Sequence, residues 1–163
     1  MRVGIGYDSH RLTEGRQLII GGVEIPFDGK GLAGHSDADV LVHSIIDALL
    51  GAAGLGDIGM MFPDTEARWK DANSIALLTA VVDRVSGCGL ELTSLDCVVI
   101  AERPRLRPYV DSMKNAIAGA GISAGLINIK AKTNETMGFI GRGEGIAAIA
   151  TCLLDEGNNS AAR

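Results

Sequence analysis

The chain has 163 residues, of which 47% are hydrophobic and 21% charged, and this suits a single domain with one buried core. Its formal net charge of -5 leaves no basic footprint for nucleic acid, so any bound anion has to meet a local positive site. No apolar stretch reaches the roughly 18 residues of a membrane span, and the N-terminus lacks the apolar core of a signal peptide. We therefore expect neither a nucleic-acid nor a membrane partner.

The three cysteines, Cys88, Cys97 and Cys152, are odd in number and form no Cys-x-x-Cys pair. Such a set is typical of reduced thiols in a cytosol-like compartment, which predicts a cytoplasmic protein. The sequence contains no internal repeat and no linker. We predict one domain over residues 1–156, followed by a small, polar and disordered tail over residues 157–163.

The first elements are short. Residues 2–8 alternate weakly and predict a strand. Residues 17–20 and 23–26 flank Gly21-Gly22 in the pattern of a hairpin. The glycine-rich residues 27–33 are expected to form a loop.

The clearest helix start lies in the run Ser36-Asp-Ala-Asp39, which fits a capping box with Ser36 as the N-cap and Asp39 at the third position. The apolar run that follows predicts a helix through Leu50. Residues 55–69 have no strong period and are expected to form a long loop, a feature that is often functional in a compact domain. Residues 73–86 are predicted to form a second amphipathic helix.

The second half of the chain predicts a strand over residues 92–101, a helix over residues 109–120 and a further strand over residues 127–133. Residues 146–154 are ambiguous, because their alanine content favours a helix whereas their short length after a glycine-rich turn allows a strand.

A possible metal site lies near the N-terminus. Asp8 and His10 are two residues apart, so on a strand they point to the same face, and His43 lies about two turns inside the first predicted helix. Two histidines and one carboxylate with an open fourth position are typical of a catalytic zinc. Asp39 or Asp47, one turn to either side of His43, could hold the second ring nitrogen of a ligand histidine. The competing interpretation is a strand-end turn and a hydrogen-bonded core histidine.

Other candidate motifs are weaker. Gly4-x-Gly6 lacks the third glycine and the ribose acid of a dinucleotide site, and residues 141–145 lack the Lys-Ser/Thr of a P-loop. Residues 132–135 end a predicted strand with a hydroxyl, an amide and the Glu135 carboxylate, which could hold a hard ion such as Mg²⁺ or simply form a polar turn. Arg142 and Glu144 could pair with each other.

Taken together, the motifs resemble a known family. Gly6–His10, His35–Thr65, Glu102–Pro108 and Lys132–Ile146 follow the order and spacing of the 2-C-methyl-D-erythritol 2,4-cyclodiphosphate synthases. The blocks HSDADV, GDIG and FPDT followed by GRGEG are specific in combination. The resemblance implies an α+β fold with two layers, a mixed four-stranded sheet with helices packed on one face, and a strand at residues 146–154. It also implies a homotrimer with active sites between subunits.

The implied reaction is a cyclisation in the non-mevalonate isoprenoid pathway. The 2-phosphate of 4-diphosphocytidyl-2-C-methyl-D-erythritol 2-phosphate attacks the β-phosphorus, and CMP leaves. The resemblance assigns Zn²⁺ to Asp8, His10 and His43, and Mg²⁺ or Mn²⁺ to Glu135. Two anionic groups must meet, so positioning and charge neutralisation should dominate the catalysis.

Individual roles also follow from the resemblance. His35 and Thr133 match positions that stabilise the transition state, and residues 101–107 match a loop that reads cytosine through its backbone. Phe139 and Arg142 match positions near the trimer axis. The implied substrate-binding positions are Asp8, His10, His35, Ser36, Asp57, Ile58, Gly59, Phe62, Asp64, Ala101, Pro104, Arg105, Leu106, Arg107, Lys132, Thr133, Glu135, Phe139 and Arg142.

Two residues depart from the pattern, because Lys132 stands where many members have threonine and Arg105 replaces a common lysine. Two other functions use the same residues. A zinc phosphohydrolase would need a base for water, such as Asp39 or Asp47. A trimeric binding module would hold a structural zinc, although such sites are usually closed by four protein ligands.

Overall fold

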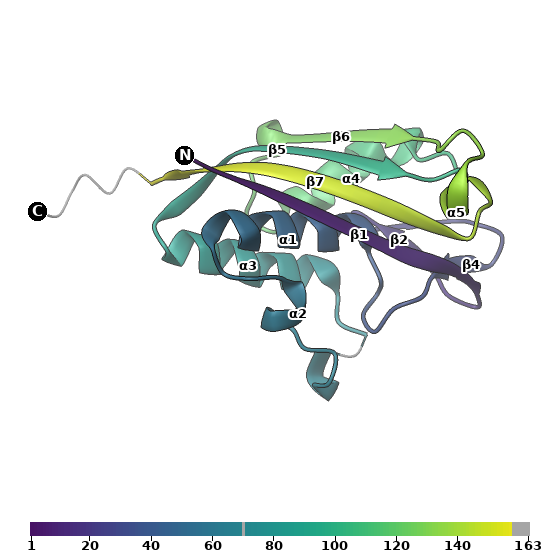
Figure 1. Cartoon of the computed structure of the whole chain (residues 1–163), viewed down its shortest axis with the longest axis horizontal. Coiled ribbons are helices and arrows are strands. Elements are labelled where there is room, and N and C mark those ends of the chain that lie inside the picture. The colour runs from purple at the N-terminus through teal and green to yellow at the C-terminus, as the bar shows by residue number, and fades with distance from the viewer. Residues whose placement is uncertain (70, 158–163) are drawn as a thin grey trace, which may run out of the picture.

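The structure, a computed structural model, describes residues 1–69 and 71–157 and is shown in Figure 1. Its centre is a mixed sheet with strand order β4-β1-β7-β5-β6. β5 and β6 run parallel, whereas the other neighbouring strands run antiparallel. The sheet strands are β1 (Arg2–Glu14), β4 (Lys30–Leu32), β5 (Leu90–Ile100), β6 (Ile127–Lys132) and β7 (Gly145–Glu156). A separate hairpin joins β2 (Leu18–Ile20) to β3 (Val23–Ile25), as the glycine pair between them predicts.

The longer helices are α1 (Val40–Ala53), α3 (Ser74–Gly87) and α4 (Val110–Ala118). In Figure 1, α1 and α3 lie along one face of the sheet, and α4 packs against β6, β3 and α3. Their buried side chains join those of the sheet in one hydrophobic core. The remaining helical elements are α2 (Ile58–Met61), α5 (Gly138–Gly141), η1 (Ala67–Trp69), η2 (Arg107–Tyr109) and η3 (Ala124–Leu126).

The predicted α+β class is confirmed, but the number of strands was wrong. Within the described residues the sheet has five strands rather than four. The reason is that β1 runs on to Glu14, well past the predicted end at Asp8, and its last residues pair with β4 in the segment expected to be a loop. The longer strand also carries His10, so Asp8 and His10 belong to the same extended element.

Small residues on β1 and β7 let α1 approach the sheet closely. A Cβ atom at Gly4 would lie 1.9 Å from the carbonyl oxygen of Ala48, and one at Gly6 would lie 1.9 Å from that of Ser44. Their strand partners are Cys152 and Ala150, and both are buried. The alanine content of residues 146–154 therefore reflects close helix packing over a strand, and the strand assignment for this segment is confirmed.

Helix α1 begins later than predicted. Asp39, not Ser36, is its N-cap and accepts a hydrogen bond from the backbone N–H of Val42 at 3.0 Å. Ala38 adopts a positive φ of 58°, so the chain cannot be helical there. The buried carboxylate of Asp39 also accepts the N–H groups of Gly21 and Gly22, and in this way it ties the β2–β3 turn to the helix start.

Two further expectations concern the ends and the surface of the chain. The predicted disordered tail lies outside the described residues from residue 158 onward, while Gly157 donates a backbone hydrogen bond to Gly89. Among the described residues, none of the helices has the length and apolar character that a bilayer crossing requires.

Candidate metal centre and active-site pocket

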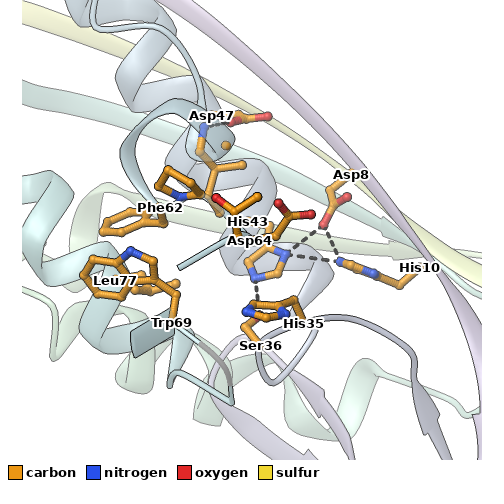
Figure 2. A pocket seen from close by; sticks show the side chains of 14 residues that line it. Asp8, His10, His35, Ser36, His43, Asp47, Phe62, Asp64, Trp69 and Leu77 are labelled. Atoms are coloured by element: carbon orange, nitrogen blue, oxygen red, sulfur yellow. Dashed lines mark hydrogen bonds and ion pairs between the residues drawn. The ribbon is translucent and has the colours of Figure 1, made fainter. Parts of the chain in front are cut away.

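The side chains of Asp8, His10 and His43 converge as predicted (Figure 2). Oδ2 of Asp8 lies 2.9 Å from Nε2 of His10 and 3.0 Å from Nδ1 of His43, and these two nitrogens are 3.2 Å apart. A tetrahedral zinc with ligands at about 2.0–2.1 Å would hold them roughly 3.3 Å apart. The three atoms are therefore spaced to hold a metal ion of this kind with little rearrangement.

In each histidine, the ring nitrogen that points away from the cluster also has a hydrogen-bond partner. Nδ1 of His10 lies 2.8 Å from the carbonyl oxygen of Ala33, which makes it the protonated nitrogen. Nε2 of His43 lies 3.1 Å from Oγ of Ser36 and 3.0 Å from Oγ of Ser74. A carbonyl or hydroxyl behind each ring leaves the other nitrogen free to face the ion.

The prediction that Asp39 or Asp47 fills this supporting role was wrong. Asp39 is occupied by backbone N–H groups at the start of α1. Asp47 accepts the backbone N–H of Ile58 at 2.8 Å and thereby holds the start of α2 against α1. Burial raises the pKa of Asp47 above its ordinary value, and the nearby charges of Asp57 and Asp8 add to the shift.

The charges at the cluster favour an ionised carboxylate. Burial opposes ionisation of Asp8, but hydrogen bonds and charge from His10 and His43 outweigh it and hold the pKa of Asp8 well below its ordinary value. For His10 burial lowers the pKa, whereas its hydrogen bond to Asp8 and the charge of that carboxylate raise it, and the net shift is upward. A proton on His10 and a metal ion thus compete for the same nitrogen.

The cluster opens into a cavity of about 460 Å³ between β1, α1 and the segment around α2. One wall is polar, and the other is formed by Phe62, Trp69 and Leu77, with Phe62 and Trp69 packed edge to face at 5.0 Å. The lining includes these predicted site residues: Asp8, His10, His35, Ser36, Asp47, Ile58, Gly59, Phe62 and Asp64.

The segment expected to be one long loop contains two short helical turns. Asp57 is the N-cap of α2, where its side chain accepts the N–H of Met60 at 2.8 Å. Asp57 itself does not line the cavity, although its neighbours Ile58 and Gly59 do.

A second group of predicted residues lines a different cavity, of about 180 Å³. Thr133 donates a hydrogen bond to Oε1 of Glu135 at 2.6 Å. The turn that presents them is held by Glu102, whose carboxylate accepts the backbone N–H groups of Asn134 and Thr136. The predicted residues along this cavity are Ala101, Pro104, Arg105, Leu106, Arg107, Lys132 and Thr133.

The last two predicted residues lie on α5 and just after it. Phe139 is 40% exposed. Nε of Arg142 lies 2.7 Å from Oε1 of Glu144, so the pairing of these two side chains is confirmed. The predicted residues thus fall into separate groups, and the two cavities have no lining residue in common.

Sequence reasoning missed several contributors to the site. Ser74 is fully buried and contacts both His43 and Asp37, yet nothing in its local pattern distinguishes it from a serine at a helix start. The pair Gly4-x-Gly6 was weighed only as a dinucleotide-binding motif, which it does not complete. Their spacing of two residues on a strand, in register with Asp8 and His10, was a usable signal of a close helix contact.

Fold and site together define an α+β protein in which an Asp-His-His cluster that could hold a metal ion lines a cavity. The model of the YgbB family matches residues 1–155, and the chain belongs to this family. A relative from Salinibacter ruber, named 2-C-methyl-D-erythritol 2,4-cyclodiphosphate synthase, is 57% identical over 155 residues, which is 94% of this chain and 98% of the relative.

Two solved structures extend the comparison. The bifunctional IspDF from Campylobacter jejuni matches 94% of this chain with a TM-score of 0.89 and 45% identity, and this chain spans 42% of that longer protein. A structure of 2C-methyl-D-erythritol-2,4-cyclodiphosphate synthase in a CDP-bound form matches 94% of this chain and 100% of its own, with a TM-score of 0.85 and 37% identity. Their likeness supports the fold over nearly the whole chain.

Proposed function

We propose that this chain carries out the reaction for which its relatives are named. It would convert 4-diphosphocytidyl-2-C-methyl-D-erythritol 2-phosphate into 2-C-methyl-D-erythritol 2,4-cyclodiphosphate and CMP, in the non-mevalonate isoprenoid pathway. The observation that carries the proposal is the Asp8–His10–His43 cluster that lines the cavity, in a chain 57% identical to a named synthase.

The ligand atoms are of the types that zinc prefers, and one coordination position of a tetrahedron is left for a substrate oxygen. A zinc ion bound there would supply a Lewis acid for the diphosphate. The chain itself has to bring the 2-phosphate and the β-phosphorus together. We assign His35 and Ser36, on the polar wall of the cavity, to the 2-phosphate end, and Phe62 and Asp64 to the methylerythritol.

The cavity beside β6 suits the nucleotide end of the substrate. We assign residues 101–107 to cytosine and Asp57 and Gly59 to the ribose hydroxyls. Thr133 is assigned to stabilising the transition state, together with His35. Glu135 is assigned to a Mg²⁺ or Mn²⁺ ion, because carboxylate and phosphate oxygens are the ligands these ions prefer. The nearby Lys132 would add positive charge opposite the phosphates.

One substrate needs both cavities, and within one chain they have no lining residue in common. We propose a homotrimer in which the 101–107 loop of one subunit completes the metal-site cavity of its neighbour. A row of exposed apolar side chains on β1, formed by Val3, Ile5 and Tyr7, supports an association through the open face of the sheet. On this assembly Phe139 and Arg142 are assigned to the region near the trimer axis.

The compartment is proposed to be the cytoplasm. Cys88, Cys97 and Cys152 are all free thiols in the structure, which is typical of a reducing compartment.

The deciding experiment is turnover in ¹⁸O-labelled water with purified protein, zinc and magnesium. Cyclisation uses the substrate's own phosphate oxygen, so CMP and the cyclic diphosphate should form in equal amounts without label, as read by mass spectrometry. Label in either product would establish hydrolysis by a zinc phosphohydrolase and overturn the proposal. Absence of any turnover with tightly bound zinc would instead favour a binding module.

A matched variant tests the metal centre. His43→Ala should remove zinc binding and turnover but leave a folded chain, because an open three-ligand site is built for chemistry rather than for holding the fold. Global unfolding of this variant, seen by circular dichroism, would indicate a structural metal.

A further inference from the structure

Behind the proposed metal centre, Ser74 contacts His43 and is itself held by Asp37. Ser74 is the first residue of α3 and is fully buried. Its Oγ lies 3.0 Å from Nε2 of His43 and donates a short hydrogen bond to Oδ1 of Asp37. The other oxygen of Asp37 accepts the backbone N–H of Ser74 at 2.8 Å. Hydrogen bonds thus connect Asp37 through Ser74 to His43, which is a proposed metal ligand.

The chemistry of these groups decides which of them donates and which accepts each hydrogen bond. An ionised carboxylate only accepts hydrogen bonds, so the single hydroxyl hydrogen of Ser74 has to point to Asp37. The oxygen of Ser74 is then left to accept, and the atom facing it is Nε2 of His43. A ring hydrogen on Nε2 satisfies this oxygen, and in that tautomer Nδ1, which faces Asp8 and His10, keeps its lone pair.

This choice of tautomer is not automatic. Oδ2 of Asp8 lies 3.0 Å from Nδ1 of His43, and by itself that carboxylate would draw the ring hydrogen to Nδ1, where it blocks a metal bond. Asp37, acting through Ser74, favours the hydrogen on the opposite nitrogen. The two carboxylates therefore compete for the same ring, and only the one behind the ring favours metal binding.

We propose that Asp37 and Ser74 are positioning residues that set the ring of His43 and its hydrogen for metal binding, with Asp37 acting only through Ser74. The proposal rests on the metal centre assigned above. It also gives Ser36 a role. Oγ of Ser36 accepts the N–H of Ala38, and once Nε2 of His43 is the donor, the hydroxyl hydrogen of Ser36 can turn into the cavity that Ser36 lines and donate to an anionic ligand.

The test is a double-mutant cycle on zinc affinity, measured by chelator competition with the full-length protein. Ser74→Ala removes the hydroxyl that joins Asp37 to His43. Asp37→Asn keeps the size of the side chain but lets its amide donate to Ser74, which reverses the direction of the hydrogen bonds. Each variant should raise the Kd for zinc by about 10- to 100-fold, the usual effect of losing such a supporting contact. If Asp37 acts on the ring only through this hydroxyl, the double variant should bind zinc no more weakly than Ser74→Ala alone. A further loss would show that Asp37 acts through the backbone N–H of Asp39, which it accepts at 3.3 Å at the start of α1.

Two exposed residues of α3, the helix that begins at Ser74, serve as controls. Ser86→Ala and Asp83→Asn make the same chemical changes in α3 away from the site and should leave zinc affinity unchanged. A second readout is the Nε2–H proton of His43 in the zinc-loaded protein, followed by NMR with labelled histidine. In the wild type this proton should be resolved and slow to exchange with water, and it should exchange faster in both site variants.

The outcomes separate the two levels of the proposal. If the wild-type protein binds no zinc, the proposed metal centre itself is wrong. Tight binding by the wild type with unchanged affinity in Asp37→Asn overturns the positioning pair, even where Ser74→Ala fails to fold. Additive losses in the double variant, or an unchanged Nε2–H proton, would assign the effect to other contacts and overturn it as well.

Discussion

Nδ1 of His43 on α1 lies 3.0 Å from Oδ2 of Asp8 on β1, although the two residues are 35 positions apart in the sequence. The contact depends on how closely the helix lies on the strand. Gly6 shares the inward face of β1 with Asp8, and a Cβ atom at Gly6 would come within 1.9 Å of the backbone oxygen of Ser44, the residue after His43. The distance between two proposed metal ligands thus depends on a glycine that is not itself a ligand.

Gly6→Ala should therefore weaken both the fold and the site. The added methyl group must push α1 away from β1, and overpacking of this kind costs about 1–3 kcal/mol of stability. We expect a lower free energy of unfolding in urea and weaker zinc binding in the protein that remains folded. A Gly6→Ala variant with the stability and zinc affinity of the wild type would contradict this account.

Gly51→Ala is the matched control, because Gly51 lies in α1 with nothing within 4 Å of a Cβ atom. Here the substitution should raise stability by about 0.5–1 kcal/mol through helix propensity alone. Zinc affinity should not change.

The pH dependence of zinc binding should follow His10. Its pKa is raised above the ordinary 6.5, whereas that of Asp8 lies below 3.8, so Asp8 stays ionised at neutral pH. A proton on His10 must leave before the nitrogen can bind a metal. Zinc affinity, measured by competition at a series of pH values, should therefore fall as the pH drops through the raised pKa of His10.

Stability without metal should show the opposite trend. Because the folded pKa of His10 is raised, its contribution to stability is complete below about pH 6.5 and is lost as the pH rises through the folded value. The contribution of Asp8, whose pKa is lowered, is present above 3.8 and is lost only in acid. Melting curves of chelator-treated protein that show no loss of stability above pH 6.5 would argue against the Asp8–His10 contact.

Asp39 is expected to matter for the fold rather than for chemistry. It is fully buried, and it caps α1 while accepting the N–H groups of Gly21 and Gly22 at 2.8 and 2.6 Å. Loss of an N-cap costs about 1 kcal/mol, and a buried N–H without an acceptor costs about 1–3 kcal/mol. Asp39→Ala should therefore lower the free energy of unfolding by about 2–4 kcal/mol.

Asn73→Ala offers a comparison, because Asn73 caps α3 at an exposed contact with the N–H of Ala76. That variant should lose only about 1 kcal/mol in the same denaturation experiment. An equal loss in the two variants would show that the contact of Asp39 with the β2–β3 turn contributes nothing.

Local pattern was enough to find much of this structure. Turn or cap residues, which contact residues only a few positions away, mark three of the elements. These are the hairpin at Gly21-Gly22 and the helices near residues 40–53 and 74–87. The pairing of Asp8 with His10 follows from the two-residue period of a strand. In each case the physical cause lies within one element, so the sequence displays it.

The parts that were missed depend on contacts between elements. The fifth strand exists because the end of β1 meets β4. The true start of α1 is at Asp39, which caps the helix while accepting the N–H groups of Gly21 and Gly22 from the distant β2–β3 turn. The partner of His43 is a serine at the start of α3, where nothing local marks it. Residues that support a site from a distant segment leave no periodic signal.

The open face of the sheet gives the last prediction. Val3, Ile5 and Tyr7 alternate with the residues that face α1, and they are 72%, 70% and 54% exposed. Ile5→Lys places a charge in the middle of this row without touching the proposed metal ligands, because Asp8 and His10 lie on the opposite face of β1 and His43 lies on α1. If the row is buried in a trimer, the variant should sediment as a smaller species and lose turnover, while its circular dichroism spectrum and zinc affinity remain.

Ala80→Lys adds the same charge at an exposed position of α3 and should leave both the trimer and turnover intact. A wild type that sediments as a monomer and still turns over would show that one chain suffices, and so would an Ile5→Lys monomer with full activity. Either result would require the metal-site cavity and the 101–107 loop to act on the substrate within a single subunit, across two cavities that have no lining residue in common.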